Sequence, residues 1–327
     1  MIRAVLVDLS GTVHQGSHVV VPGAVEAIHR LLQVADTGVS NNTTSSPLLV
    51  RFLTNTSTMS SQQLLALLHS LGFTKIRQEH LMTSLLATRS YLQRQSTNAK
   101  ALNPFYLLED TSDFENVNGS QEETSSDTSY NCVVLGLAPS KFQYETLNQA
   151  FEVLQRYPEN PLIAVHRAMY IKESTSKPDP GGSAVEKDAF RLGPGAFVTA
   201  LEAAVDNWNT SAQPRAHTVI MGKPSKEFFH SALTLDNGST VDPQEACMIG
   251  DDVIQDIHGA RDAGIGTTLL VQTGKYRPGD EHRTKTSNTA TTDATAQVPT
   301  KTVPSIVEAI DYVLQNLAEE QQSARLH

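Results

Sequence analysis

The chain has little cysteine and no long apolar segment, and both shortages exclude classes of protein. Its two cysteines among 327 residues, Cys132 and Cys247, each lie inside an apolar run, so we expect buried free thiols rather than a disulfide or a metal site. No run approaches the roughly 18 apolar residues of a transmembrane helix, and Asp8 interrupts the first apolar segment too early for a signal peptide. We therefore expect a cytosolic protein with no membrane partner.

Positive charge is also scarce. The sequence carries 35 Asp and Glu residues against 25 Lys and Arg residues, which gives a net charge of −10 at pH 7. Such a chain has no overall positive potential that would hold nucleic acid, so any phosphate group must be bound by a few local residues. The pattern G-x-G-x-x-G follows none of the predicted strands, which excludes a dinucleotide site of the Rossmann type.

Short apolar runs alternate along the chain with segments of helical periodicity, which predicts an α/β fold. This alternation is typical of βαβ units and therefore of a doubly wound parallel sheet with helices on both faces. The predicted strands cover residues 4–7, 50–53, 104–108, 132–137, 162–165, 218–221, 246–249 and 267–271. The predicted helices cover residues 22–32, 60–71, 81–94, 143–155, 197–205, 226–233, 256–263 and 303–317.

Five segments between these elements are rich in Ser, Thr, Asn, Asp and Gly and have no apolar period. Such a composition buries too little apolar surface to offset the entropy of ordering, so we predict loops or disordered insertions. The segments cover residues 35–47, 111–131, 173–188, 206–217 and 285–300.

Polar residues follow four of the predicted strands, in the motifs VLVDLSGT, RFLTNTS, TVIMGKP and ACMIGDDVIQD. In an open parallel sheet, ligands bind beyond the carboxyl ends of the strands, which is where these residues are expected. Taken singly, Asp8 could cap a turn, Thr54 could start a loop, Lys223 could be a solvated lysine and Asp251 could cap a helix. Taken together, they supply a nucleophile, a hydroxyl, a cation and a carboxylate in one site.

This set fits phosphoryl transfer through an aspartyl phosphate. A carboxylate such as Asp8 can attack phosphorus only if the repulsion between two anions is removed. A Mg²⁺ ion shared by Asp8 and Asp251 would do this, and Lys223 would neutralise the oxygens that gain charge. The Thr54 hydroxyl, with backbone N–H groups of the Gly11 and Asn55 loops, would hold the phosphoryl group in line.

The four motifs, in this order, resemble those of the haloacid dehalogenase superfamily of phosphatases. The resemblance covers nearly the whole chain outside the polar segments. It implies that Asp8 is the nucleophile, Thr54 the hydroxyl of the second motif, Lys223 the lysine of the third, and Asp251 with Asp256 the acids of the fourth.

The resemblance also implies the domain organisation. We expect a Rossmann-like core at residues 1–85 and 216–327, into which an α/β cap is inserted at residues 86–215 after the second motif. Because the cap contributes to dimer interfaces in related proteins, a homodimer is a further expectation from the resemblance.

Ser10 departs from the usual pattern of the superfamily, which has there a second aspartate that protonates the leaving group and then activates water. A serine hydroxyl is a poor acid or base near neutral pH, and such catalysis is worth roughly 10²–10⁴-fold in rate. The backbone carbonyl of Ser10 would still bind the metal. We interpret Ser10 as selecting leaving groups of low pKa, such as phosphate or a protonated phosphoramidate, or else as the mark of a weak enzyme.

Several further residues have two interpretations each. Asp256 is predicted to support the metal site from the next helix, whereas Asp252 could equally be a solvated helix cap. Asn55 either contacts the substrate phosphate or makes a local turn bond. His166 and Arg167 follow the predicted cap strand 162–165 and are candidates for contacting the substrate, with ordinary loop residues as the alternative.

We therefore predict a Mg²⁺-dependent phosphohydrolase that acts through a phosphoaspartate at Asp8 on a small phosphorylated substrate, pyrophosphate or a phosphoramidate. A non-catalytic binding or scaffold protein on the same fold is the alternative, because Ser10 removes the usual acid. A phosphorylation-dependent regulator would share the aspartate, threonine and lysine, but it is usually shorter and needs no inserted cap.

Overall fold

The structure is a computed structural model that describes residues 1–16, 19–37, 48–96, 101–115, 130–174, 188–208, 217–235, 238–283 and 298–325. The five predicted loop segments fall largely outside these ranges. The chain divides into two compact units. The core unit comprises Met1–Thr54, Gln62–Thr83 and Lys223–His327, and the inserted unit comprises Asn55–Ser61 and Ser84–Gly222.

The core unit is built on a six-stranded sheet in which all the pairings are parallel. From one edge to the other the strands are β14 (Lys301–Val303), β13 (Thr267–Val271), β12 (Ala246–Gly250), β1 (Ala4–Asp8), β4 (Leu49–Thr54) and β5 (Leu81–Thr83). All five residues of the central strand β1 are buried, as its apolar sequence predicts for a strand covered on both faces. The predicted doubly wound α/β core is confirmed.

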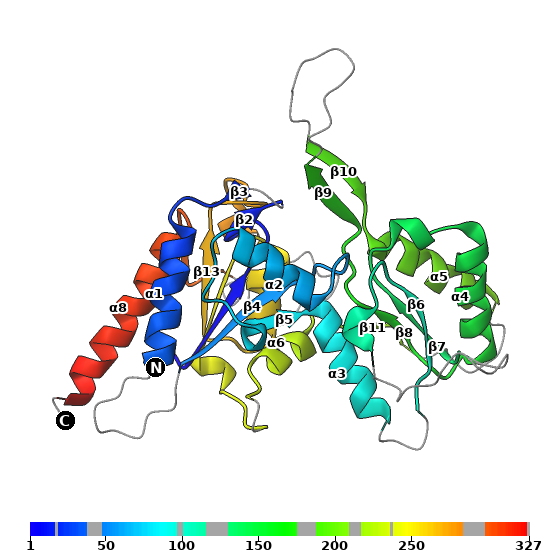
Figure 1. Cartoon of the computed structure of the whole chain (residues 1–327), viewed down its shortest axis with the longest axis horizontal. Coiled ribbons are helices and arrows are strands. Elements are labelled where there is room, and N and C mark those ends of the chain that lie inside the picture. Colours follow the sequence, from blue (N-terminus) through cyan, green and yellow to red (C-terminus); the bar gives the residue numbers. More distant parts are fainter. Residues whose placement is uncertain are drawn as a thin grey trace, which may run out of the picture. The chain divides into compact units, whose positions relative to one another are not determined.

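Helices cover both faces of this sheet. Figure 1 shows α1 (Ala24–Thr37) and α8 (Ile306–Arg325) on one face and α2 (Ser61–Ser70) and α6 (Lys226–Ala232) on the other. An ion pair of 2.9 Å between Arg30 and Asp311 joins α1 to α8 on their exposed sides. No helix in the described part of the chain is both long and apolar enough to cross a membrane.

The inserted unit has a parallel sheet of its own, with four strands in the order β11 (Val219–Ile220), β8 (Leu162–Ala164), β7 (Cys132–Leu135) and β6 (Pro104–Leu107). Its helices are α3 (Ser84–Ser96), α4 (Tyr144–Arg156) and α5 (Pro194–Trp208). Leu135, Leu154 and Leu201 belong to one buried cluster that joins this sheet to α4 and α5. Burial of such side chains in a second, separate cluster gives the unit its own hydrophobic core.

Shorter elements make up the rest of the secondary structure in the described residues. They are the ribbons β2 (His14–Gln15) with β3 (Val19–Val20) and β9 (Tyr170–Ser174) with β10 (Asp188–Leu192), the π-helix η5 (Val253–His258), the helix α7 (Gly259–Asp262), and the single turns η1 (Gln78–His80), η2 (Ser112–Phe114), η3 (Pro139–Lys141), η4 (Pro243–Glu245) and η6 (Asp280–His282).

Two predictions of secondary structure need correction. The predicted helices 81–94 and 303–317 are too long at their starts, because Leu81–Thr83 and Lys301–Val303 form the edge strands β5 and β14. Strands of three residues are too short to display an alternating pattern. The ribbon of β9 and β10 was not predicted either.

The strand predicted at residues 218–221 lies in the sheet of the inserted unit, where Val219 pairs with Ile163 of β8. The sequence of a buried strand is apolar in either sheet, so the pattern of apolar residues does not show to which sheet the strand belongs. The chain passes from the inserted unit to the core unit at Gly222 and Lys223.

The prediction of buried free thiols is confirmed. Cys132 and Cys247 are buried and form no disulfide with each other. Burial raises the pKa of each thiol to about 12.

Candidate active site

Asp8 is the last residue of β1, and its side chain is 6% exposed. One carboxylate oxygen accepts a hydrogen bond of 3.0 Å from the Thr12 hydroxyl, and the other forms an ion pair with the ammonium group of Lys223. Both partners hold the carboxylate in a fixed orientation at the carboxyl end of the sheet.

The chain turns sharply after Asp8. Gly11 adopts a φ of 96°, and its N–H group donates to the carbonyl of His14 at 2.7 Å. A Cβ atom on Gly11 would lie 2.2 Å from Oδ2 of Asp251, so only glycine fits there. The side chain of Ser10 is exposed.

Asp251 follows directly after β12, the neighbour of β1 in which Ile249 pairs with Val7. Its buried carboxylate accepts a hydrogen bond of 2.6 Å from the backbone N–H group of Lys275. Burial, together with the negative charges of Asp8 and Asp256, raises its pKa well above the ordinary value for a carboxyl. Asp251 is therefore a carboxylate that a nearby cation would stabilise.

Asp256 lies in the π-helix η5, a form of helix often found at functional sites. Its Oδ2 accepts from the N–H group of Asp252 at 3.0 Å, and its Oδ1 lies 2.7 Å from Nζ of Lys223. Burial raises its pKa to about 7, against the opposing effect of Lys223. Asp256 thus anchors the lysine as well as belonging to the acidic cluster.

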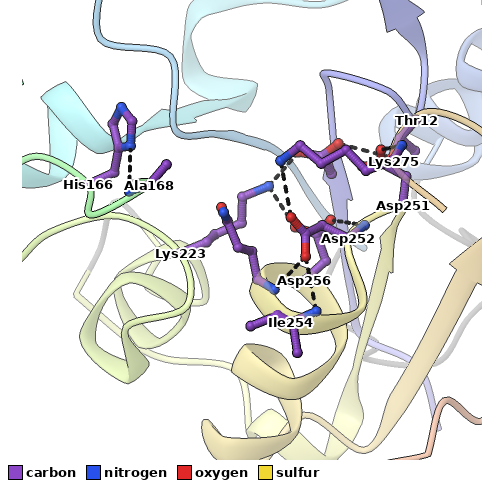
Figure 2. A network of polar contacts seen from close by, with 11 residues as sticks. Thr12, His166, Ala168, Lys223, Asp251, Asp252, Ile254, Asp256 and Lys275 are labelled. Carbon is purple, nitrogen blue, oxygen red and sulfur yellow. Dashed lines mark hydrogen bonds and ion pairs between the residues drawn. The ribbon is translucent and has the colours of Figure 1, made fainter. Parts of the chain in front are cut away.

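Asp252 caps η5, since its Oδ1 accepts from the N–H group of Ile254 at 3.0 Å (Figure 2). The same oxygen accepts from the N–H group of Gln255 at 3.1 Å. Its Oδ2 lies 3.1 Å from Nζ of Lys275. Although burial raises its pKa, the charge of Lys275 and these N–H groups bring the pKa of Asp252 below its ordinary value. These contacts agree with the interpretation of Asp252 as a helix cap.

Lys223 lies between Asp8 and Asp256, with only 4% of its side chain exposed. Burial alone would lower its pKa, but the negative charges of Asp256 and Asp8 outweigh burial and raise the pKa. The lysine is therefore positively charged throughout the neutral range. It brings a fixed cation into contact with the candidate nucleophile.

Three of these carboxylates are arranged so that they could hold a cation. One oxygen from each of Asp8, Asp251 and Asp256 lies within 4.8 Å of the others, and all three side chains are buried. Buried carboxylates this close repel one another, as the raised pKa values of Asp251 and Asp256 reflect. Hard oxygen ligands and excess negative charge fit a divalent ion such as Mg²⁺.

Thr54 ends β4, the other neighbour of β1, and comes one residue after Leu53, the partner of Asp8 in the register. Its side chain is buried. The predicted hydroxyl therefore lies at the same end of the same sheet as Asp8. Asn55 belongs to the inserted unit. Its side chain packs against Gly222, because a Cβ atom added to Gly222 would lie 2.4 Å from Oδ1 of Asn55.

His166 and Arg167 have partners within the inserted unit. Nδ1 of His166 accepts from the N–H group of Ala168 at 3.4 Å (Figure 2), and its Nε2 lies 3.4 Å from Oγ of Ser57. Nη1 of Arg167 donates to Glu202 at 3.0 Å. These contacts are structural, and a role of either residue toward substrate stays a prediction.

Lys275 and Thr273 contact the site but are absent from the sequence prediction. Both belong to the motif VQTGKY, which begins at the last residue of the predicted strand 267–271. The reasoning applied to the other four strand ends would have found them.

Comparison with known proteins relates this site to one family. Residues 5–107 match a family model described as haloacid dehalogenase-like hydrolase, and residues 220–319 match a model described as HAD-hydrolase-like. The two ranges contain the residues of the acidic cluster and Lys223. They leave out most of the inserted unit.

Curated relatives match over almost the whole chain. Haloacid dehalogenase-like hydrolase domain-containing protein 2 of Homo sapiens is 39% identical over 318 residues, which cover 97% of each chain. Phospholysine phosphohistidine inorganic pyrophosphate phosphatase of Rattus norvegicus is 31% identical over 321 residues, which cover 97% of this chain and 96% of the relative.

A solved structure, a 4-nitrophenylphosphatase from Thermotoga maritima, has the same fold, with a TM-score of 0.68, 21% identity and coverage of 95% of this chain and 97% of that one. The predicted family resemblance and the predicted enzyme class, a hydrolase with phosphatases among its relatives, are confirmed. On the identity and coverage of these relatives, the chain belongs to the haloacid dehalogenase-like hydrolases.

Proposed function

We propose that the protein is a Mg²⁺-dependent phosphohydrolase that acts through an aspartyl phosphate at Asp8. The observation that carries the proposal is the contact of one buried cation, Lys223, with a candidate nucleophile that also belongs to a cluster of three buried carboxylates. A purely structural ion pair has no need of the second and third carboxylates, because burying each charge is costly.

The reaction would proceed in two displacements at phosphorus. A carboxylate oxygen of Asp8 forms a bond to phosphorus while the bond to the leaving group breaks and its electron pair departs with the leaving group. Water then attacks the phosphorus, the bond to Asp8 breaks, and both protons of the water remain with the phosphate product. Lys223 neutralises the phosphoryl oxygens, and Thr54 orients the group in line.

Asp8, Asp251 and the backbone carbonyl of Ser10 would hold the Mg²⁺ ion, with Asp256 supporting both the ion and Lys223. When bound, the ion offsets the repulsion between the carboxylate nucleophile and an anionic substrate. The charges agree with this assignment, because three carboxylates, Asp8, Asp251 and Asp256, lie around the one ammonium group of Lys223 that is in contact with the cluster.

We infer that the substrate has a leaving group of low pKa, such as pyrophosphate or a phosphoramidate. Ser10 lacks the acidity to protonate a poor leaving group, and a relative 31% identical is named as a pyrophosphate phosphatase. The same serine motivates the alternative of a catalytically weak protein that serves as a binding module.

The remaining predictions belong to the same proposal. The inserted unit would act as the cap over the site, with Asn55, His166 and Arg167 as its contacts to a small phosphorylated substrate, and Gly11 would contribute a backbone N–H group. A cytosolic homodimer is the proposed physiological form.

The test is release of phosphate by the purified chain from pyrophosphate, imidodiphosphate and a chromogenic aryl phosphate, with Mg²⁺ or with a chelator. We expect Mg²⁺-dependent turnover that Asp8→Asn abolishes. Asp242→Asn is a matched control, because Asp242 is exposed and caps a distant turn. A folded protein that hydrolyses none of the three would favour the binding module instead.

A further inference from the structure

The segment Thr273, Gly274 and Lys275, here called the β13 loop, contacts two parts of the candidate active site at once. The hydroxyl of Thr273 donates to the carbonyl of Gly11 at 2.6 Å. Two residues later, the N–H group of Lys275 donates to Oδ2 of Asp251, also at 2.6 Å. All the groups involved belong to the core unit.

Gly274, between these two donors, packs directly against both partners. It has a φ of 57°, and a Cβ atom there would lie 2.0 Å from Oδ2 of Asp251 and 2.6 Å from Cα of Gly11. No other residue fits this position without moving the carboxylate. The loop backbone is therefore in van der Waals contact with the site.

The bond from Thr273 acts on the turn that follows the nucleophile. Gly11 is held on both sides, since its carbonyl accepts from Thr273 and its N–H group donates to the carbonyl of His14. The peptide between Ser10 and Gly11 is trans, so the carbonyl of Ser10 points away from the N–H group of Gly11. The bond to His14 thus sets the direction of the Ser10 carbonyl, which shares a peptide plane with the N–H group of Gly11. The bond from Thr273 holds the next peptide of the same turn, so the loop acts on the Ser10 carbonyl through this turn.

The bond from Lys275 acts on a carboxylate that its neighbours repel. Asp251 is buried beside Asp8 and Asp256, and their negative charges disfavour its ionised form. A hydrogen bond to a carboxylate is charge-assisted and short, as the 2.6 Å distance is here. This bond therefore holds Oδ2 of Asp251 in one orientation.

We propose that the β13 loop is a positioning element that presents two metal-binding groups together, the Asp251 carboxylate and the Ser10 carbonyl. The proposal deepens the function proposed above and rests on the Mg²⁺ site assigned there. Neither Thr273 nor Lys275 needs to touch substrate in this role. Each acts through the group that it holds.

The test measures Mg²⁺ binding without turnover. The thermal midpoint of the full chain is recorded against Mg²⁺ concentration, and the concentration that gives half of the full shift is compared between variants. Loss of a group that orients a metal ligand typically weakens metal binding about 10- to 100-fold. We expect Thr273→Val to raise the half-shift concentration about tenfold or more, and Thr273→Ser, which keeps the hydroxyl, to restore it.

Thr268→Val is the matched control. Thr268 lies on β13, the strand that leads into the loop. It is fully buried and bonds with Thr300 rather than with the site. This variant should lower the thermal midpoint but leave the half-shift concentration of Mg²⁺ unchanged. If Thr273→Val fails to fold, Gly274→Ala provides a second test, because its methyl group would displace Asp251 directly.

Wild-type Mg²⁺ affinity in Thr273→Val, or in Gly274→Ala, would overturn the role of the loop while leaving the proposed function intact. A wild-type chain that Mg²⁺ does not stabilise would overturn both. Weakened Mg²⁺ binding in Thr268→Val as well would show a general effect of destabilising β13 and would also overturn the specific role.

Discussion

Nζ of Lys223 lies 2.7 Å from Oδ1 of Asp256 while the same ammonium group forms an ion pair with Asp8. This one residue joins the acid of the π-helix to the acid of the central strand. The arrangement leaves each carboxylate dependent on a single buried cation, and the consequences can be measured.

Replacing this cation should be costly to the fold. In Lys223→Met, Asp8 and Asp256 keep their burial and lose their shared counter-charge, and breaking a buried ion pair typically costs about 3–5 kcal/mol. Urea unfolding at neutral pH measures the change. Lys226→Met, at an exposed position three residues on, should change the free energy of unfolding by less than about 0.5 kcal/mol. Equal effects of the two substitutions would contradict the account.

The acidic cluster predicts how stability depends on pH in the absence of metal. The pKa of Asp256 is about 7 in the folded state and about 3.9 in an unfolded chain. Between these values the folded chain binds a proton that the unfolded chain has lost, so stability falls as the pH rises through this window. Thermal unfolding in a chelator should show this fall.

Two controls isolate the effect. Asp256→Asn removes this titrating group and should weaken the dependence, although Asp251 still contributes to it. Mg²⁺ should also reduce the dependence, since the cation offsets the charge that appears. A metal-free protein whose stability rises from about pH 5 to pH 7, in parallel with the Asp256→Asn variant, would contradict the raised pKa.

The serine at position 10 predicts a gain of function. Ser10→Asp introduces an acid in the position where its side chain is exposed, and general acid catalysis is worth roughly 10²–10⁴-fold. Hydrolysis of alkyl phosphates should therefore improve relative to that of pyrophosphate. Ser10→Asn has almost the same shape without the acid and should give no gain. Equal behaviour of the two variants would count against the leaving-group interpretation.

Asp113 predicts a contribution to stability within the inserted unit. Its buried carboxylate accepts from the N–H group of Ser61 at 2.9 Å and from the Ser61 hydroxyl at 2.6 Å. Asp113→Ala leaves that N–H group without its acceptor and should destabilise the protein by about 1–3 kcal/mol. Ser61→Ala removes only the hydroxyl and should cost less. Urea unfolding measures the loss of stability in both variants. A loss in Ser61→Ala as large as that in Asp113→Ala would contradict this prediction.

The parts of the fold that the sequence predicted share a physical cause. The strand β1 and the acid at its end are visible because four apolar residues precede a single aspartate, and a parallel strand buried on both faces requires that pattern. Asp251 after β12 is visible for the same reason. Residues at strand ends meet in space because the register of a parallel sheet brings these ends together.

What the sequence did not reveal depends on contacts made by the backbone. The position after a strand end points to the segment that contains Lys275, but the bond to Asp251 comes from its backbone N–H group. Any residue but proline would supply that group, so the side chain does not reveal this bond. The two edge strands β5 and β14 are fixed by pairing with β4 and β13 rather than by their own composition. The assignment of β11 to the second sheet is likewise a matter of pairing.

The covalent intermediate at Asp8 tests the central claim most directly. Borohydride reduces an acyl phosphate to the alcohol, so trapping during turnover of pyrophosphate with Mg²⁺ should convert Asp8 to homoserine, which mass spectrometry of the peptide detects. Because Ser10 activates water poorly, the intermediate should accumulate. We predict this modification at Asp8 only when both Mg²⁺ and substrate are present. Release of phosphate at an undiminished rate with Asp8 unmodified, or in the Asp8→Asn variant, would contradict the account.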